Sequence, residues 1–107
     1  MKIKTSEATG AVLDWLVAKC EGTTHLFDAH DVGRLNYSTD QALGGPIIES
    51  MLAAGLLLQA RPETNRWAAS VDTPNRFHHG PTALVAAMRC FVTSKLGTEV
   101  EVPDELI

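Results

Sequence analysis

The sequence of 107 residues lacks several features that would place it in a particular class. Its longest apolar run, residues 51–58, is far shorter than the roughly 20 residues that a membrane-spanning helix needs. The opening MKIKTSEATG has two lysines but no apolar stretch after them, so no secretory signal is expected. Cys20 and Cys90 do not have the spacing of a redox or metal-binding pair and are interpreted as small buried hydrophobes. These absences predict a cytoplasmic protein.

Motifs of the common hydrolases and of phosphate-binding loops are also missing, including GxSxG, HExxH and the Walker pattern. The net charge of −4 argues against a nucleic-acid partner, because such binding depends mainly on neutralising phosphates. We therefore assign no catalytic residue and no cofactor, and an enzyme is the less favoured class.

The histidines are the one set that invites a test for metal binding. Two lie with Asp28 and Asp31 in HLFDAHD and two are adjacent further along the chain: His25, His30, His78 and His79. Neither group has the spacing of a zinc site, and no cysteine pair accompanies them. The sequence therefore predicts no metal ligand, and a small metal-dependent hydrolase remains only as the second alternative.

The hydrophobic pattern predicts one α+β domain over residues 1–107, with three helices packed on a small, mostly antiparallel sheet that contains a central β-hairpin. Residues 1–5 are expected to form a strand with Ile3 inward. Thr5 or Ser6 is expected to cap a first helix that stops at Gly22. Pro46 is expected to begin a second helix, with Ile47, Ile48, Met51 and Leu52 on its buried face and Gly55 at its end.

The second half of the chain has the clearest pattern. Residues 56–60 and 66–71 are predicted to form the hairpin, and residues 72–80 a polar loop. A third helix is predicted over residues 81–96, with one apolar stripe and a stop at Gly97. The tail after that glycine alternates and can add a short edge strand.

The stretch NYSTDQALGGPIIES, residues 36–50, joins a hydroxyl-rich loop to two glycines and the proline of the second expected helix. Glycine lets a ligand approach the main chain, and a helix N-terminus offers unpaired N–H groups and a partial positive charge. A second Gly-Pro, Gly80-Pro81, precedes the third helix. Either dipeptide alone is more simply explained as the ordinary start of a helix.

The charges are unevenly distributed along the chain. Residues 56–95 contain five basic and two acidic residues, a net of +3 within a chain of net −4. Arg89, in the middle of the third expected helix, can reach solvent or point into a pocket, and arginine suits phosphate recognition. Weak surface pairs between these arginines and the acidic tail are an equally good explanation.

The segments YSTDQALGGPIIE, RWAA, GPTALVAAMR and LGTEVEVPDEL, after the opening KTSEATGAVLDWLVAKCEG, resemble the NinX-like family of small tailed-bacteriophage and prophage proteins of unknown function. The resemblance covers nearly the whole chain. It implies an accessory protein in the cytoplasm of the infected or lysogenic host cell, and analogy suggests roles such as counter-defence. The family loop has an additional Pro-Ser and a tryptophan in place of Gln41, so any stacking by that aromatic is lost or relocated here.

The leading hypothesis is a non-enzymatic binder of a small, anionic, nucleotide-like ligand, such as a host defence signal. Aromatic faces would suit a base, hydroxyls and a carboxylate a ribose, and arginine with helix amides a phosphate. The predicted ligand-binding residues are Tyr37, Ser38, Thr39, Asp40, Gly44, Gly45, Trp67, Thr82 and Arg89.

A protein-binding inhibitor or adaptor of a host factor is the alternative function. It would use Trp15, the loop and the acidic tail of residues 99–105 as its contact surface. A homodimer is also expected, because a small chain with apolar residues 56–58 and an edge strand often covers surplus apolar surface by pairing.

Overall fold

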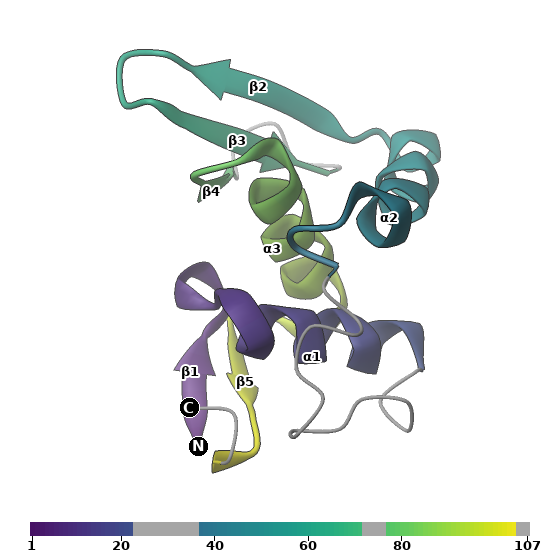
Figure 1. Ribbon diagram of the computed structural model, residues 1–107, viewed down its shortest axis with the longest axis vertical. Helices are drawn as coiled ribbons and strands as arrows, with labels where there is room; N and C mark the ends of the chain where they lie inside the picture. Colours follow the sequence, from purple (N-terminus) through teal and green to yellow (C-terminus); the bar gives the residue numbers. More distant parts are fainter. Residues whose placement is uncertain (23–36, 72–76, 105–107) are drawn as a thin grey trace.

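The computed structural model of the protein describes residues 1–22, 37–71 and 77–104. Within these ranges, three α-helices and two small sheets confirm the α+β class (Figure 1). Helix α3 runs through the middle, with a β-hairpin at one end of the molecule and the strand pair that contains the N-terminus at the other. No helix of the described part is long and apolar enough to cross a membrane.

The predicted hairpin is present and belongs to a three-stranded antiparallel sheet. Its strands are β2, Leu57–Arg61, and β3, Arg66–Ser70, with β4, His78–Gly80, added beside β3. Strand β4 lies where the sequence predicted a polar loop. Its pairing depends on close packing, because a Cβ at Gly80 would lie 2.7 Å from the backbone nitrogen of Ala86. Such a strand carries no local hydrophobic signal.

The second sheet pairs β1, Lys2–Lys4, with β5, Glu99–Glu101, in antiparallel register. Both strands were predicted, and Ile3 lies opposite the buried Val100. The strands are therefore divided between two sheets, where the sequence predicted one. Helix α3 and the turn before α1 separate them (Figure 1).

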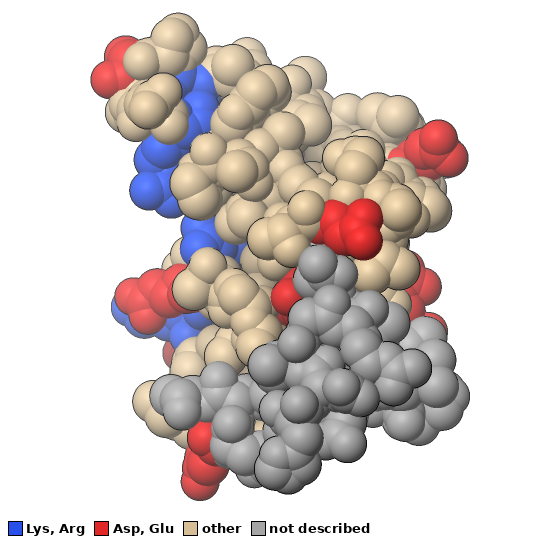
Figure 2. All heavy atoms as spheres, in the orientation of Figure 1, with Lys and Arg blue, Asp and Glu red and all other residues tan. Residues whose placement is uncertain are grey.

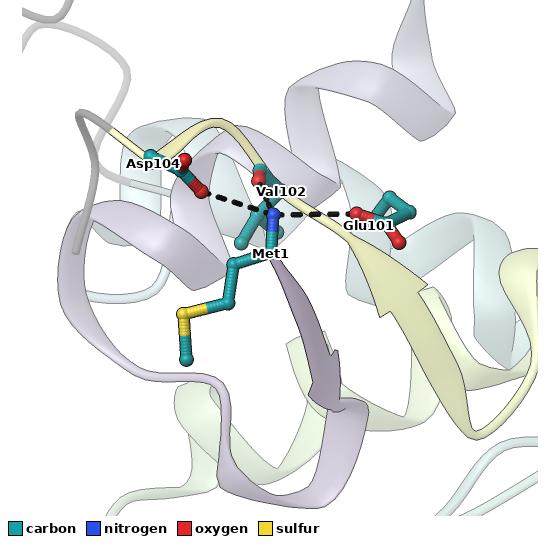
Figure 3. A network of polar contacts seen from close by, with 4 residues as sticks. All are labelled: Met1, Glu101, Val102 and Asp104. Carbon is teal, nitrogen blue, oxygen red and sulfur yellow. Dashed lines mark hydrogen bonds and ion pairs between the residues drawn. The ribbon is translucent and has the colours of Figure 1, made fainter.

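The α-amino group of Met1 connects the start of β1 to the chain at the end of β5 (Figure 3). It donates to the carbonyl oxygen of Val102 at 2.8 Å, and it lies 3.1 Å from the carboxylate of Asp104 and 3.2 Å from that of Glu101. The two carboxylates raise the pKa of the amino group, Asp104 more than Glu101. These contacts hold the start of β1 against the chain that follows β5.

The first helix begins later than predicted. A short 3-10 turn, η1, covers Thr5–Glu7, residues 8–9 are extended, and α1 covers Gly10–Glu21. The Thr5 hydroxyl does not cap a helix but donates to the Gly97 carbonyl at 2.7 Å, and the Ala8 carbonyl accepts from Arg89 at 2.8 Å. These two long-range hydrogen bonds take the place of a local helix start.

The second helix begins earlier than predicted. Helix α2 covers Gln41–Ala53, and the Asp40 carboxylate caps it by accepting from the N–H of Ala42 at 2.9 Å. Pro46 therefore lies inside the helix, exposed to solvent, where the prediction made it the first residue. Leu52 was expected on the buried face but is 58% exposed.

Helix α3, Ala83–Leu96, forms the centre of the core. Its cap is Thr82, the residue after the proline that was expected to start it, and it ends at Gly97 as predicted. The sequence predicted one apolar stripe, but all residues from 85 to 92 are buried, because α1, α2, β3 and β4 all pack against this helix. Arg89 is therefore inside the core, near the two sheets.

Candidate functional site

Ser38, one of the predicted ligand contacts, is committed to the fold. Its N–H and its hydroxyl both donate to Oδ1 of Asp14 on α1, at 2.8 and 2.7 Å. Burial raises the pKa of Asp14, and the two hydrogen bonds from Ser38 lower it. The sequence analysis did not single out Asp14, although an acid within the apolar run VLDWLV of α1 was a signal. This contact joins α1 to the entrance of α2.

Gly44 was expected to present its backbone to an anion, but it serves close packing. Its N–H donates to the Asp40 carbonyl at 2.9 Å. A Cβ at this position would lie 2.5 Å from the carbonyl oxygen of Tyr37 and 2.6 Å from a methyl group of Leu84. At Gly45, a Cβ would meet only the flexible end of the Gln41 side chain. The Gly44 amide is therefore engaged within the helix start.

The two aromatic residues of the predicted site offer no open stacking face. Tyr37 is only 7% exposed, and Trp67 on β3 is half-buried and packed against the core. A base needs an accessible ring face on which to stack. Thr39 is exposed, and Thr82 accepts from the N–H of Val85 at 3.1 Å as the cap of α3.

Arg89 joins two segments that are far apart in the sequence. Its Nε donates to the carbonyl of Ala8 and its Nη1 to the carbonyl of His79, both at 2.8 Å. The side chain is buried, and burial, followed by the nearby charge of Arg66, lowers its pKa. Among the described residues, no carboxylate forms an ion pair with it. Within residues 1–22, 37–71 and 77–104, the hydrogen-bond partners given to this buried positive charge are two neutral carbonyl groups.

The predicted site residues do not converge on one point. Gly44 packs against Leu84, and Leu84 and Arg89 are five residues apart on α3, so they point about 140° apart round the helix axis. The entrance of α2 and the Arg89 guanidinium thus lie on different sides of α3.

A hollow of about 150 Å³ lies between the two sheets. We call it the inter-sheet hollow. Strand β1, turn η1, strand β4, helix α3 and the start of β5 all contribute to it, and every lining residue is polar: Lys4, Thr5, Ser6, His78, Thr93, Thr98 and Glu99. His78 was weighed as a metal ligand, and Glu99 belongs to the acidic tail of the alternative function, but none of the seven is among the predicted ligand-binding residues. They come from distant parts of the chain and form no local motif.

Arg89 is close to this hollow, although it is not among the lining residues. Its two acceptors, Ala8 and His79, lie two residues after Ser6 and one residue after His78, both of which line the hollow. On α3, which we call the floor of the hollow, the hydroxyl of the lining residue Thr93 donates to the Arg89 carbonyl at 2.8 Å. The buried arginine therefore connects the chain after η1 to strand β4 next to the hollow.

Basic side chains gather along one edge of the face shown in Figure 2, beside the hairpin sheet. At the hollow itself, Lys4 and His78 are the basic groups and Glu99 is the one acid among the lining residues. Within the described part of the chain, no three His, Cys, Asp or Glu side chains are placed to hold a metal ion, and His25 and His30 lie outside that part. The hollow is thus a polar site with cationic groups around it.

The cysteines offer no reactive thiol near the hollow. Burial raises the pKa of Cys20 to about 11, so its thiol stays protonated at neutral pH. Cys90 is buried in α3. Both fit the interpretation as small hydrophobes.

Comparison with known proteins identifies one family. The model of the family described as Bacteriophage P22, NinX matches residues 4–95 of the chain. The match includes five of the seven residues that line the inter-sheet hollow, and Thr98 and Glu99 follow it. A comparison with curated protein sequences finds no match.

Proposed function

Because the chain belongs to the bacteriophage P22 NinX family, we propose that it is a phage accessory protein that binds a small anionic ligand, without catalysis, in the inter-sheet hollow. The observation that carries this proposal is the buried charge of Arg89, which hydrogen-bonds to the chain next to two lining segments of the hollow and has no carboxylate partner among the described residues.

The physical argument begins with the cost of burying a charge. An ionised side chain away from water is costly unless it is paired or hydrogen-bonded. Two carbonyl oxygens satisfy part of the Arg89 guanidinium, but they carry no net negative charge. A buried cation next to a polar hollow produces a positive potential there, which favours an anion over a neutral molecule.

The rim of the hollow supports the same conclusion. The ammonium of Lys4 adds a second positive charge, and the imidazole of His78 can hydrogen-bond to an anion. Glu99 lies beside Lys4 in the β1–β5 register, so a carboxylate also faces the ligand and can accept hydrogen bonds from it. An anion with hydrogen-bond donors elsewhere on the molecule matches this arrangement.

A phage protein that sequesters a signal of the host cell needs affinity and no turnover. We propose this as its use of the site.

The test is thermal unfolding in the presence of inorganic phosphate and a panel of phosphorylated metabolites. A ligand that binds only the folded state at 100 times its Kd stabilises it by about 2.7 kcal/mol. We expect at least one phosphorylated compound to raise the Tm, and Lys4→Gln to reduce that shift. Lys2→Gln is the matched control, because it removes the same charge from the same strand but does not line the hollow.

Two results would count against the proposal. One is a Tm that no member of the panel raises. The other is an equal loss of the shift in Lys2→Gln and Lys4→Gln, which would indicate binding to general surface charge, a kind of binding that salt screens strongly.

A further inference from the structure

We infer that the anionic ligand is of the sugar-phosphate class, recognised through the hydroxyl groups of its sugar and its phosphate, with no pocket for a base. This inference rests on the proposed function above, because it names the ligand of the same hollow. Its basis is the hydrogen-bond polarity of the floor, the size of the hollow and the placement of the aromatic residues.

The floor of the hollow offers acceptors. The Thr5 hydroxyl donates to the Gly97 carbonyl at 2.7 Å, and the Thr93 hydroxyl donates to the Arg89 carbonyl at 2.8 Å. A carbonyl oxygen cannot donate, so the single hydrogen of each hydroxyl is committed to the protein. Thr5 is fully buried, so of the two it is the partly exposed Thr93 oxygen that can offer its lone pairs to a ligand. A ligand on this floor must bring O–H or N–H donors.

Glu99 extends the acceptor surface. Its ionised carboxylate accepts hydrogen bonds and donates none. Lys4, its cross-strand partner, carries only donors. The lining therefore combines acceptors, at Thr93 and Glu99, with donors at Lys4, which lies beside Glu99 on the same face of the strand pair. A sugar phosphate is complementary to this combination, because it carries both hydroxyl donors and an anion.

The size of the hollow selects a small ring. Its volume is about 150 Å³. A cavity of about this volume admits a molecule of the size of benzene, and drug-sized ligands occupy about 300–1,000 Å³. A five-membered or six-membered sugar ring fits the hollow, but a whole nucleotide would leave its base outside.

The aromatic residues do not receive a base at this place. The lining contains no Phe, Tyr or Trp side chain, and its one aromatic ring is the imidazole of His78. Tyr37, the aromatic of the predicted ligand loop, is buried at the entrance of α2, on a different side of α3. A base attached to the sugar therefore meets no large aromatic face in the lining of the hollow.

Isothermal titration calorimetry with four probes tests this inference: ribose 5-phosphate, ribose, inorganic phosphate and adenosine 5′-monophosphate. Ribose 5-phosphate is expected to bind at least tenfold more tightly than ribose or phosphate. The adenosine monophosphate is expected to bind within threefold of ribose 5-phosphate, because its base lies outside the hollow.

Thr93→Val tests the acceptor floor, because it replaces the hydroxyl by a methyl group of similar size. We expect it to weaken ribose 5-phosphate about tenfold and to leave the affinity for inorganic phosphate unchanged. Ser94→Ala is the matched control. Its hydroxyl donates to the Phe91 carbonyl at 2.7 Å on the same helix, but it does not line the hollow. Ser94→Ala is expected to bind all four probes as the wild type does.

The outcomes separate this inference from the proposed function. Equal affinities for phosphate and ribose 5-phosphate, with no effect of Thr93→Val, would overturn the ligand class and leave the anion site in place. Adenosine monophosphate binding more than tenfold tighter than ribose 5-phosphate would also overturn it, because the base would then be recognised. Binding of none of the phosphorylated probes would remove both.

Discussion

Replacing Arg89 is expected to destabilise the fold far more than replacing its neighbour Arg66. In Arg89→Ala, the carbonyls of Ala8 and His79 lose their donors, and the buried volume of the side chain is left empty. A hydrogen bond to a charged group contributes about 1.5–3 kcal/mol. Two such bonds give a gross loss of about 3–6 kcal/mol, which is partly offset because a charge no longer has to be buried. We therefore expect a net loss of about 3 kcal/mol in the free energy of unfolding.

Urea denaturation followed by circular dichroism measures this effect. With an m-value of about 1–3 kcal/mol/M, as small proteins have, the midpoint should fall by about 1–3 M. Arg89→Lys keeps the charge but loses the planar fork that reaches two carbonyls, so it should lie between the wild type and Arg89→Ala. Arg66→Ala should be neutral or slightly stabilising, because the Arg66 charge lowers the pKa of Arg89. A denaturation midpoint of Arg89→Ala equal to that of Arg66→Ala would refute the role of Arg89 as the connection between the chain after η1 and strand β4.

Three further predictions concern the entrance of α2. Gly44→Ala should lower the free energy of unfolding by about 1–3 kcal/mol, because its Cβ would meet the Tyr37 carbonyl at 2.5 Å. Gly45→Ala should be neutral or stabilising by up to about 1 kcal/mol. Equal denaturation midpoints of the two variants would contradict this. Asp14→Asn should destabilise less than Asp14→Ala, because both bonds from Ser38 end on one oxygen, which an amide can supply; the same midpoints decide it. Since burial raises the pKa of Asp14 above 3.8, the folded state holds this proton more tightly, and stability from this group is lost as pH rises through the raised pKa. The free energy of unfolding of Asp14→Asn should therefore rise relative to that of the wild type as pH increases over that range. A difference in denaturation midpoint that stays constant between pH 4 and 7 would count against this prediction.

Local sequence signals predicted the ends of the helices better than their starts. Gly22 and Gly97 end α1 and α3 as predicted, because both have a positive φ, which glycine adopts without steric cost. The start of α1 could not be predicted in the same way. Thr5 has the chemistry of a helix cap, but its hydroxyl is used by Gly97, 92 residues further along the chain. Contacts over such distances leave no trace in a local pattern.

In the candidate site, too, local sequence signals predicted some features and missed others. Arg89 was singled out because an arginine in the middle of an apolar helix reaches solvent or points into a pocket, and because arginine suits phosphate recognition; the structure buries it against two acceptors. Its acceptors are backbone carbonyls, which every residue carries, so no side-chain pattern could identify them. The inter-sheet hollow was not foreseen for the same reason. Its lining consists of ordinary polar residues, which form a site only when the two sheets pack beside α3.

The most direct test of the proposed site is a titration of ¹⁵N-labelled protein with ribose 5-phosphate, followed by amide chemical shifts. The account predicts saturable shifts concentrated at the residues of the inter-sheet hollow, above all the amides of Thr5, Ser6, Thr93 and Thr98. The amides of residues 38–45 at the entrance of α2 should remain unchanged. Shifts centred on residues 38–45, or no saturable shifts with any phosphorylated ligand, would contradict it.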